Sequence, residues 1–414
     1  MNSSESIAVK ATVTFILVYG SLRTGGIETL IVRMAKYLTK NGYGVIVCCG
    51  EGGMASSLPS NAHVLTYKGT NDLRLKLRMN NASALHDLTD VIIVSFDPIS
   101  AARALWVELA CSAGQKVSHL SGVFHPRAYF MTGERKDRIF LNHLVARAVG
   151  YSHMFFMNEE CRVANAKRWN VDLSDSPIAA LPIDAAERIW AAKRGSEMRI
   201  VSVGRLVDFK AYNLGAPGIV KSLRKRGVQL SWDIYGSGSL QPDIQTEIEK
   251  CGVGDVVCLR GELPYSDFQA RVSAYDIFVG IGTAALEAAM VGVPTICATD
   301  SHREHSYGFI YELPFGNLGE LQSSPPTVEI QDLIAEFACA TESDRARKSD
   351  MCRAAAMRYE MTGFIGQLLA VHQQQGAKPS RLIKRFGAWL YCAATESKAV
   401  GILRQPVGTD SRPL

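Results

Sequence analysis

The sequence predicts an α/β protein of two Rossmann-like, doubly wound domains, on three observations. The chain has 414 residues, 47% of them hydrophobic, whereas a single hydrophobic core usually stops growing near about 250 residues. Short apolar, β-branched runs recur between helix-like stretches, which is typical of buried parallel strands. These runs form two series separated by the polar segment 185–198. We therefore expect each series to build one domain.

The first series lies within residues 1–185 and predicts an N-terminal domain. Its expected strands are Val13–Val18, Val45–Cys49, Val91–Val94, Val117–Leu120 and Met154–Met157. After the first strand, apolar residues recur at helical spacing at Ile27, Leu30, Ile31, Met34 and Leu38. Asn41-Gly42 is then a good signal for a helix end. The chain is therefore expected to open with a βαβ unit.

The second series lies within residues 197–352 and predicts a C-terminal domain. Its expected strands are Ile200–Val203, Ser231–Tyr235, Val256–Leu259, Ile277–Val279 and Thr295–Ala298. Pro182, Asp184 and the charged segment 191–197 indicate the linker between the domains. Residues 353–375 predict a last helix that packs back toward the N-terminal domain, and residues 376–414 form a basic tail.

Composition narrows the class of protein. The ten cysteines include no CxxC pair, which favours a reducing compartment and argues against structural zinc. No apolar run approaches the roughly 18 residues of a membrane span, so we expect a cytoplasmic protein. The tail carries seven basic and two acidic residues, which equals the +5 of the whole chain. The formally neutral body makes nucleic acid an improbable partner, because such binding rests on many phosphate contacts.

Residues that follow the expected strands are the candidates for ligand binding, because ligands of open α/β sheets sit beyond the carboxyl ends of the strands. The glycine-rich turn 19–29 contains Gly25 and Gly26 and leads into a helix N-terminus, which favours an anion. Its spacing is not the GxGxxG of dinucleotide sites. A tight strand-to-helix turn without a ligand is the other interpretation.

The second domain offers two cations and a carboxylate at such positions. Arg205 and Lys210 follow an expected strand on a loop. The planar guanidinium of the arginine and the ammonium of the lysine together suit a diphosphate. A solvated surface is the alternative. Gly282 and Thr283, an expected N-cap, begin a helix whose apolar face includes Glu287. A carboxylate in that setting needs donors, and sugar hydroxyls are good ones.

Four features in this order resemble the retaining glycosyltransferases of family 4, the group 1 transferases, and the resemblance extends to about Gln374. They are the turn Gly25-Gly26-Ile27-Glu28, His125 within Gly122–Pro126, the segment Gly204-Arg205-Leu206 with Lys210, and Leu286-Glu287-Ala288 with Gly292-Val293-Pro294. The resemblance implies a GT-B fold with two domains facing a cleft. It also implies sugar transfer from a nucleotide-diphosphate sugar, with retention, to a lipid-linked or polysaccharide acceptor in surface polysaccharide biosynthesis.

The resemblance also implies roles for single residues. Arg205 and Lys210 would hold the donor diphosphate, Glu287 the ribose hydroxyls, and His125 would lie beside the donor sugar. Gly25 and Gly26 would let backbone amides approach the phosphates, and Gly282 and Thr283 would present the second helix N-terminus. The first domain would then serve the acceptor.

One position departs from the family's Glu-x7-Glu pattern. The residue eight before Glu287 is Val279, which we expect inside a shortened loop. A non-catalytic nucleotide-sugar-binding subunit and a nucleotide-sugar epimerase of the same architecture therefore stay as alternatives.

No metal or cofactor is expected beyond the donor substrate. His302 and His305 form an HxxH pair, but no DxD triplet or carboxylate-rich motif accompanies it. We interpret the pair as part of a solvated loop.

The tail 376–414 contains a basic amphipathic pattern. Leu382, Phe386, Trp389 and Ala393 recur at helical spacing, while Arg381, Lys384, Arg385 and Ala388 occupy the other side. Such a helix can lie in the interface of an anionic membrane, at the inner face of the cell membrane. Packing on the N-terminal domain with a solvated basic face is the alternative.

Overall fold

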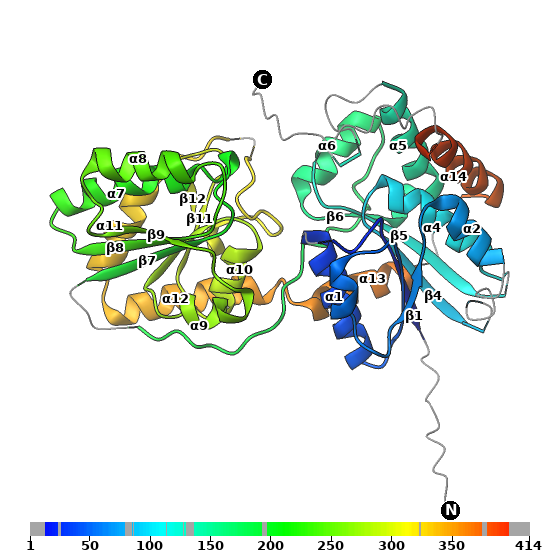
Figure 1. Ribbon diagram of the computed structural model, residues 1–414, viewed down its shortest axis with the longest axis horizontal. Coiled ribbons are helices and arrows are strands. Elements are labelled where there is room, and N and C mark those ends of the chain that lie inside the picture. Colours follow the sequence, from blue (N-terminus) through cyan, green and yellow to red (C-terminus); the bar gives the residue numbers. More distant parts are fainter. Residues whose placement is uncertain are drawn as a thin grey trace, which may run out of the picture. The chain divides into compact units, whose positions relative to one another are not determined.

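The computed structural model describes residues 13–23, 26–78, 85, 87–112, 114–126, 128–129, 136–192, 197–322, 324–374 and 379–396. The chain forms two compact units (Figure 1). Unit 1 comprises Met1–Ala179 and Ile365–Leu414, and unit 2 comprises Ala180–Phe364. The two predicted α/β domains are thus present, and each is described below by itself.

Unit 1 contains a six-stranded parallel sheet in the order β3-β2-β1-β4-β5-β6. Its strands are β1 (Thr14–Val18), β2 (Gly44–Cys49), β3 (His63–Thr66), β4 (Asp90–Ser95), β5 (Lys116–Val123) and β6 (Met154–Phe156). The five predicted strands are confirmed within a few residues. The edge strand β3 was missed, because only Leu65 of its four residues is buried, and so it has no apolar run.

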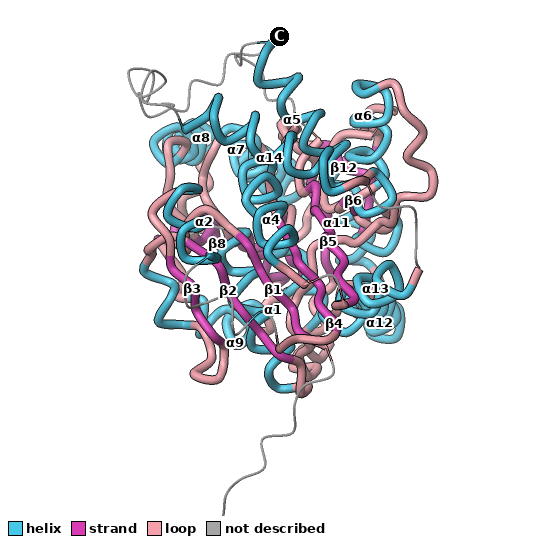
Figure 2. Tube along the Cα trace, turned by 90° about the vertical axis from the view of Figure 1, so that its right-hand side faces the viewer, coloured by secondary structure: helices cyan, strands magenta, loops and turns pink. Residues whose placement is uncertain are grey.

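The helices of unit 1 lie on both sides of this sheet. They are α1 (Gly26–Lys40), α2 (Thr70–Arg78), α4 (Pro98–Ala110), α5 (Lys136–Val149), α6 (Glu159–Trp169), α13 (Met361–Gln373) and α14 (Arg381–Glu396). Helix α4 packs against β4 and β5, and α14 packs in turn on α4 and α5 (Figure 2). All five residues of the central strand β1 are buried, as expected for a strand covered on both faces.

Unit 2 contains a seven-stranded sheet in the order β13-β12-β11-β10-β7-β8-β9. Its strands are β7 (Met198–Val203), β8 (Leu230–Tyr235), β9 (Val257–Gly261), β10 (Ile277–Gly280), β11 (Thr295–Ala298), β12 (His305–Phe309) and β13 (Val328–Glu329). The first five are parallel and were predicted. The last two pair antiparallel at one edge, and they were missed because neither contains a continuous apolar run.

The helices of unit 2 are α7 (Tyr212–Lys225), α8 (Gln241–Cys251), α9 (Phe268–Val272), α10 (Thr283–Met290), α11 (Ile330–Cys339) and α12 (Glu342–Met357). The linker ahead of β7 is partly packed rather than solvated. Trp190 is buried, its indole nitrogen donates to the carbonyl of Tyr275 at 2.8 Å, and its amide donates to Val291. Burying this aromatic side chain fixes the strap 180–192 on unit 2.

The predicted single helix 353–375 is divided in the structure. Helix α12 ends at Met357 and α13 begins at Met361. Between them, the Tyr359 carbonyl accepts the amide of Ile183, and Glu360 bridges to the same residue. Those backbone bonds are incompatible with a continuous helix ladder. The chain returns to unit 1 within α13, at Ile365.

Both sheets share one topological feature. In each, the first strand is central, the next strand lies on one side of it, and a later strand pairs with its other side. The order in which strands are added to the sheet therefore reverses between β1 and β4 in unit 1, and between β7 and β10 in unit 2. Open α/β sheets bind their ligands at this switch point, beyond the carboxyl ends of the two strands.

Candidate functional site

The switch point of unit 2 gathers the cations predicted from the sequence. Lys210 ends the single 3-10 turn Asp208–Lys210 that follows β7. Its ammonium nitrogen lies only 2.2 Å from where a Cβ of Gly204 would be, and Gly204 has a φ of 150°. A glycine is thus required for Lys210 to fold back over the strand end.

Arg205 stands beside this lysine. Burial lowers the pKa of Lys210 to about 8, and repulsion by the Arg205 guanidinium adds to the effect. The two cations are therefore close enough to interact, while Arg205 itself is exposed. A bound dianion would offset both the free-energy cost of burying the ammonium charge and the repulsion between the two cations. Lys210 itself is partly buried, whereas a fully solvated lysine would be exposed.

Two more glycines join the loop after β8 to the loop after β7. Gly236 and Gly238 have φ values of 140° and 153°, and their missing Cβ positions lie 1.9 Å from the carbonyl oxygen of Gly204 and 2.2 Å from that of Leu206. The Leu206 amide donates to the Ser237 carbonyl at 2.9 Å. The backbone that carries Arg205 is thus held by direct backbone contact.

The loop after β9 continues this layer. The amide of Gly236 donates to the carbonyl of Gly261 at 2.7 Å, and the Ser237 hydroxyl donates to Glu262 at 2.6 Å. The loops after three adjacent strands therefore form one hydrogen-bonded edge.

Helix α10 starts at the other side of the switch point. Its N-cap is Gly282, with a φ of 72° and no side chain to cap the helix, so the expectation that Thr283 is the N-cap was wrong by one residue. The amide of Gly282 donates to the carbonyl of Leu318 at 2.8 Å. Because no side chain caps this N-terminus, its dipole can act on an external anion.

Glu287 lies one turn into α10 and is 7% exposed, among buried alanines and Leu286. Its position is the one expected for a carboxylate that accepts hydrogen bonds from hydroxyl groups.

The interpretation of Val279 was wrong. Val279 lies within β10 and is fully buried, and its carbonyl accepts the Ser202 hydroxyl at 2.7 Å. The shortened loop is only Ile281–Gly282. A glutamate eight residues before Glu287 would therefore place a charge inside the sheet.

The residues predicted in unit 1 follow the strand ends of their own sheet. Gly26 is the first residue of α1, and no described atom lies within 4 Å of where its Cβ would be. Gly25 lies outside the described residues. His125 is exposed and follows β5, and its carbonyl accepts the amide of Ala128 at 3.0 Å.

The switch point of unit 1 holds aromatic side chains that the sequence analysis missed. Tyr19 follows β1 and meets Phe96, which follows β4, edge to face at 6.1 Å between ring centroids; Phe96 stacks on Phe124 at 6.0 Å. Burial raises the pKa of Tyr19. Asp97 caps α4 by accepting the amide of Ser100 at 2.6 Å. The sequence signal that could have predicted this cluster is an aromatic residue at the end of each of the two apolar runs that form β1 and β4.

Among the described residues, no three His, Cys, Asp or Glu side chains gather as a metal site would require. Within the same residues, no helix is both long and apolar enough to cross a bilayer.

The match to a known protein family lies within unit 2. Residues 186–304 match the family model "Glycosyl transferases group 1". WcaL of Escherichia coli K12, which its name assigns to colanic acid biosynthesis as a glycosyltransferase, is 28% identical over 116 residues, or 25% of this chain. WcaL of Salmonella typhimurium is 26% identical over 119 residues. The matched segment spans only 28% of the length of the E. coli relative.

Solved structures resemble nearly the whole chain. A glycosyltransferase from Rickettsia africae has a TM-score of 0.64 and 12% identity, with 88% of this chain and 98% of that chain covered. The lipopolysaccharide outer core galactosyltransferase WaaB has a TM-score of 0.57 and 15% identity, covering 88% and 99%. For TarM the TM-score is 0.60 at 11% identity, covering 89% and 100%. The chain therefore has the two-domain α/β fold of the GT-B glycosyltransferases, as predicted, and carries the group 1 match within unit 2.

Proposed function

We propose that this protein is a glycosyltransferase that moves a sugar from a nucleotide-diphosphate sugar to a lipid-linked or polysaccharide acceptor in surface polysaccharide biosynthesis. The observation that carries the proposal is the pair Arg205 and Lys210 at the switch point of unit 2, with the pKa of Lys210 lowered to about 8. This pair, Gly282 and Glu287 all lie within the matched residues 186–304. The names of the WcaL relatives support the biosynthetic setting.

Arg205, Lys210 and the N-terminus of α10 would stabilise the leaving diphosphate. As the bond from the sugar to the diphosphate breaks, negative charge collects on the phosphate oxygens, and preorganised donors lower the barrier. Arg205 offers a planar fork and Lys210 a point charge. These groups supply the positive charge that a metal ion gives in other transferases, so the reaction is proposed to be independent of metals.

The transfer is proposed to retain the anomeric configuration by attack on the front face. The acceptor oxygen forms the new bond to the sugar carbon on the face that the diphosphate leaves, and a donor phosphate oxygen takes the acceptor proton. Glu287 would accept hydrogen bonds from the ribose hydroxyls, and His125 would lie beside the donor sugar. For a lipid-linked acceptor, the protein would work peripherally at the cytoplasmic face of the membrane through residues 376–414.

A thermal-shift screen against UDP-, GDP- and ADP-sugars tests this function, because a ligand that binds only the folded state raises the melting temperature. We expect one nucleotide class to stabilise the protein, Lys210→Ala to abolish the shift, and Lys221→Ala on α7, an exposed lysine far along the chain from the strand ends, to preserve it. Absence of a shift with all three classes at millimolar concentration would contradict the proposal.

A non-catalytic nucleotide-sugar-binding subunit is the second candidate, because Val279 stands in the sheet and the glutamate of the Glu-x7-Glu pattern is missing. Such a subunit would be stabilised by the donor but would consume none of it with any acceptor. Release of an epimerised nucleotide sugar without acceptor would instead indicate an epimerase.

A further inference from the structure

Helix α14 is packed on unit 1 by one narrow face. The residues of that face are Lys384, Gly387, Ala388 and Tyr391, all of them buried. A Cβ on Gly387 would lie 2.9 Å from the Cβ of Ala148 in α5, so the glycine permits a close helix crossing. Lys384 forms a buried ion pair with Glu108 of α4. The helix is therefore fixed on α4 and α5.

The opposite face of α14 is apolar and exposed. Its large side chains are Leu382, 79% exposed, Phe386, 56%, Trp389, 54%, and Ile383, 41%. At about 3.6 residues per turn, Leu382, Phe386 and Trp389 form one stripe opposite the buried face. Neither interpretation from the sequence was complete, because the helix packs on the domain through Lys384 and Ala388 and still presents its apolar stripe outward.

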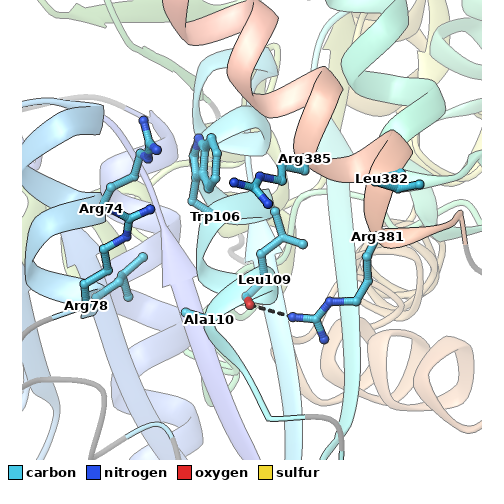
Figure 3. A pocket seen from close by; sticks show the side chains of 9 residues that line it. Arg74, Arg78, Trp106, Leu109, Ala110, Arg381, Leu382 and Arg385 are labelled. Atoms are coloured by element: carbon cyan, nitrogen blue, oxygen red, sulfur yellow. Dashed lines mark hydrogen bonds between the residues drawn. The ribbon is translucent and has the colours of Figure 1, made fainter.

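A cationic pocket adjoins this stripe. A cavity of about 380 Å³ lies between α2, α4 and α14 and is lined by the four arginines Arg74, Arg78, Arg381 and Arg385, by Trp106 and by apolar side chains, with no carboxylate among them. Figure 3 shows Arg74 and Arg78 on one side of Trp106 and Arg381 and Arg385 on the other.

The pocket is built rather than incidental. The Arg74 guanidinium lies 4.2 Å from the ring centroid of Trp106, which orients it. Arg381 donates to the carbonyl of Leu109 at 2.8 Å, which ties α14 to the end of α4. The indole nitrogen of Trp106 is buried and has no hydrogen-bond partner among the described residues. A phosphate oxygen in the pocket would meet guanidinium donors from two helices, and Leu382 lines the same cavity.

We propose that the arginine pocket and the stripe of α14 together form a site for an anionic phospholipid, with the phosphate headgroup in the pocket and Leu382, Phe386 and Trp389 in the membrane interface. The inference rests on the proposed function, because it assigns a structural site to the membrane on which a lipid-linked acceptor resides.

The chemistry of the surface favours a membrane over other occupants. Tryptophan, phenylalanine and leucine beside cations are the composition of helices that bind in the plane of an anionic interface. Each Lys or Arg near such a surface adds about 1 kcal/mol to the binding free energy. Because about 1.4 kcal/mol corresponds to a tenfold change in affinity, each residue strengthens binding roughly fivefold. A second copy of the chain would bring four like charges against the same four arginines, which opposes self-association through this face.

The test is sedimentation of the full-length protein with vesicles of phosphatidylcholine alone and of phosphatidylcholine mixed with phosphatidylglycerol. We expect binding to the mixed vesicles only, a decline in raised salt, and a blue shift of tryptophan emission that Trp389→Phe removes. Point variants are used because deleting α14 would uncover Ala148 and leave Glu108 unpaired.

Two variants separate the pocket from the stripe. Arg78→Gln with Arg385→Gln and, separately, Phe386→Ser with Trp389→Ser should each weaken vesicle binding about tenfold or more. Lys221→Gln with Lys225→Gln, a pair of exposed lysines on α7, removes the same charge elsewhere and should leave binding unchanged.

Several outcomes would overturn the inference. If only the arginine variant lost vesicle binding, the pocket would be a site for a soluble anion such as free phosphate. If the lysine control lost vesicle binding equally, the effect would be one of net charge and not of this pocket. A dimer that dissociates in the Phe386 and Trp389 variant would assign the stripe to a second copy, and loss of binding only on removal of 397–414 would assign it to that segment. Stabilisation by nucleotide sugars is measured in parallel on the same variants and should be unchanged, so failure of the proposed function is seen separately.

Discussion

The two switch points of the molecule have the same topology and opposite chemistry. In unit 2, β7 and β10 are followed by glycine-held cations and by α10, whose N-cap Gly282 has no side chain. In unit 1, β1 and β4 are followed by packed aromatic rings and by α4, whose N-terminus is capped by the carboxylate of Asp97. The N-terminus of the helix that follows the second strand of the switch point is therefore open in unit 2, at α10, and capped by a carboxylate in unit 1, at α4.

This difference shows that the sheet topology gives the place of a site but not its ligand. The positive, glycine-lined edge of unit 2 suits a diphosphate. The aromatic edge of unit 1, with an internal carboxylate, suits an uncharged or sugar-like partner better than a phosphate. These contacts support the proposal that unit 2 binds the donor and unit 1 the acceptor.

The largest effect is expected from the cations of unit 2. Arg205→Ala and Lys210→Ala should each lower turnover on the order of 10²-fold or more, because each removes a preorganised donor to the leaving group. Tyr19→Phe at the switch point of unit 1 should leave nucleotide affinity unchanged. Steady-state rates and melting curves of the three variants decide the matter, and near-wild-type rates in both cation variants would remove the diphosphate assignment.

The two positions of the Glu-x7-Glu pattern should differ in kind. Glu287→Ala should weaken nucleotide binding by roughly 10- to 100-fold, since hydrogen bonds to a charged group contribute about 1.5–3 kcal/mol. Val279→Ala should leave kcat close to wild type and instead lower the free energy of unfolding by about 2 kcal/mol, because it removes buried methyl groups from β10. Calorimetric titration and chemical denaturation separate the two outcomes. Loss of activity in a stable Val279→Ala protein would mean that the loop is wrongly assigned.

Unit 1 contains a buried histidine that should make its stability depend on pH. Burial lowers the pKa of His119 in β5 from its usual 6.5 to about 3, and Lys384 adds to the shift. Below pH 6.5 the histidine is protonated in the unfolded chain but stays neutral in the folded protein. Its contribution to the free energy of unfolding is therefore fully present above pH 6.5 and falls by about 1 kcal/mol per pH unit below it. Hydrogen exchange of the β5 amides, corrected for intrinsic rates, should therefore accelerate between pH 7 and 5. His119→Gln should flatten this dependence, and an unchanged slope in that variant would contradict the account.

The smallest effect is expected from metal removal. In the proposed site, Arg205, Lys210 and the open N-terminus of α10 would stabilise the diphosphate without a metal ion, so dialysis against EDTA should leave the transfer rate unchanged. A strict requirement for a divalent ion, restored by adding Mg²⁺ or Mn²⁺, would show that Arg205 and Lys210 do not suffice.

The sequence predicted those parts of the molecule that local patterns determine. Ten of the strands follow from apolar runs in the sequence, and Arg205 and Lys210 follow from their position after one of these runs. Contacts between distant segments were not visible, such as Gly236 against the carbonyl of Gly204, the Tyr359 bond to Ile183 that splits the last helix, and the aromatic rings after β1 and β4. Val279 was misread because the length of a loop depends on where the strand stops hydrogen-bonding, which the sequence does not reveal.

Proton uptake on nucleotide binding tests the central claim most directly. A diphosphate beside Lys210 must raise the pKa of its ammonium group from about 8, so binding near pH 8.5 should take up to about one proton from solution. Titration calorimetry with the nucleoside diphosphate chosen by the screen, in buffers of different ionisation enthalpy, measures this number. The account predicts uptake in the wild type and none in Lys210→Arg, which stays charged at this pH. Tight binding without proton uptake, or the same uptake in Lys210→Arg, would contradict the assignment of the diphosphate to the switch point of unit 2.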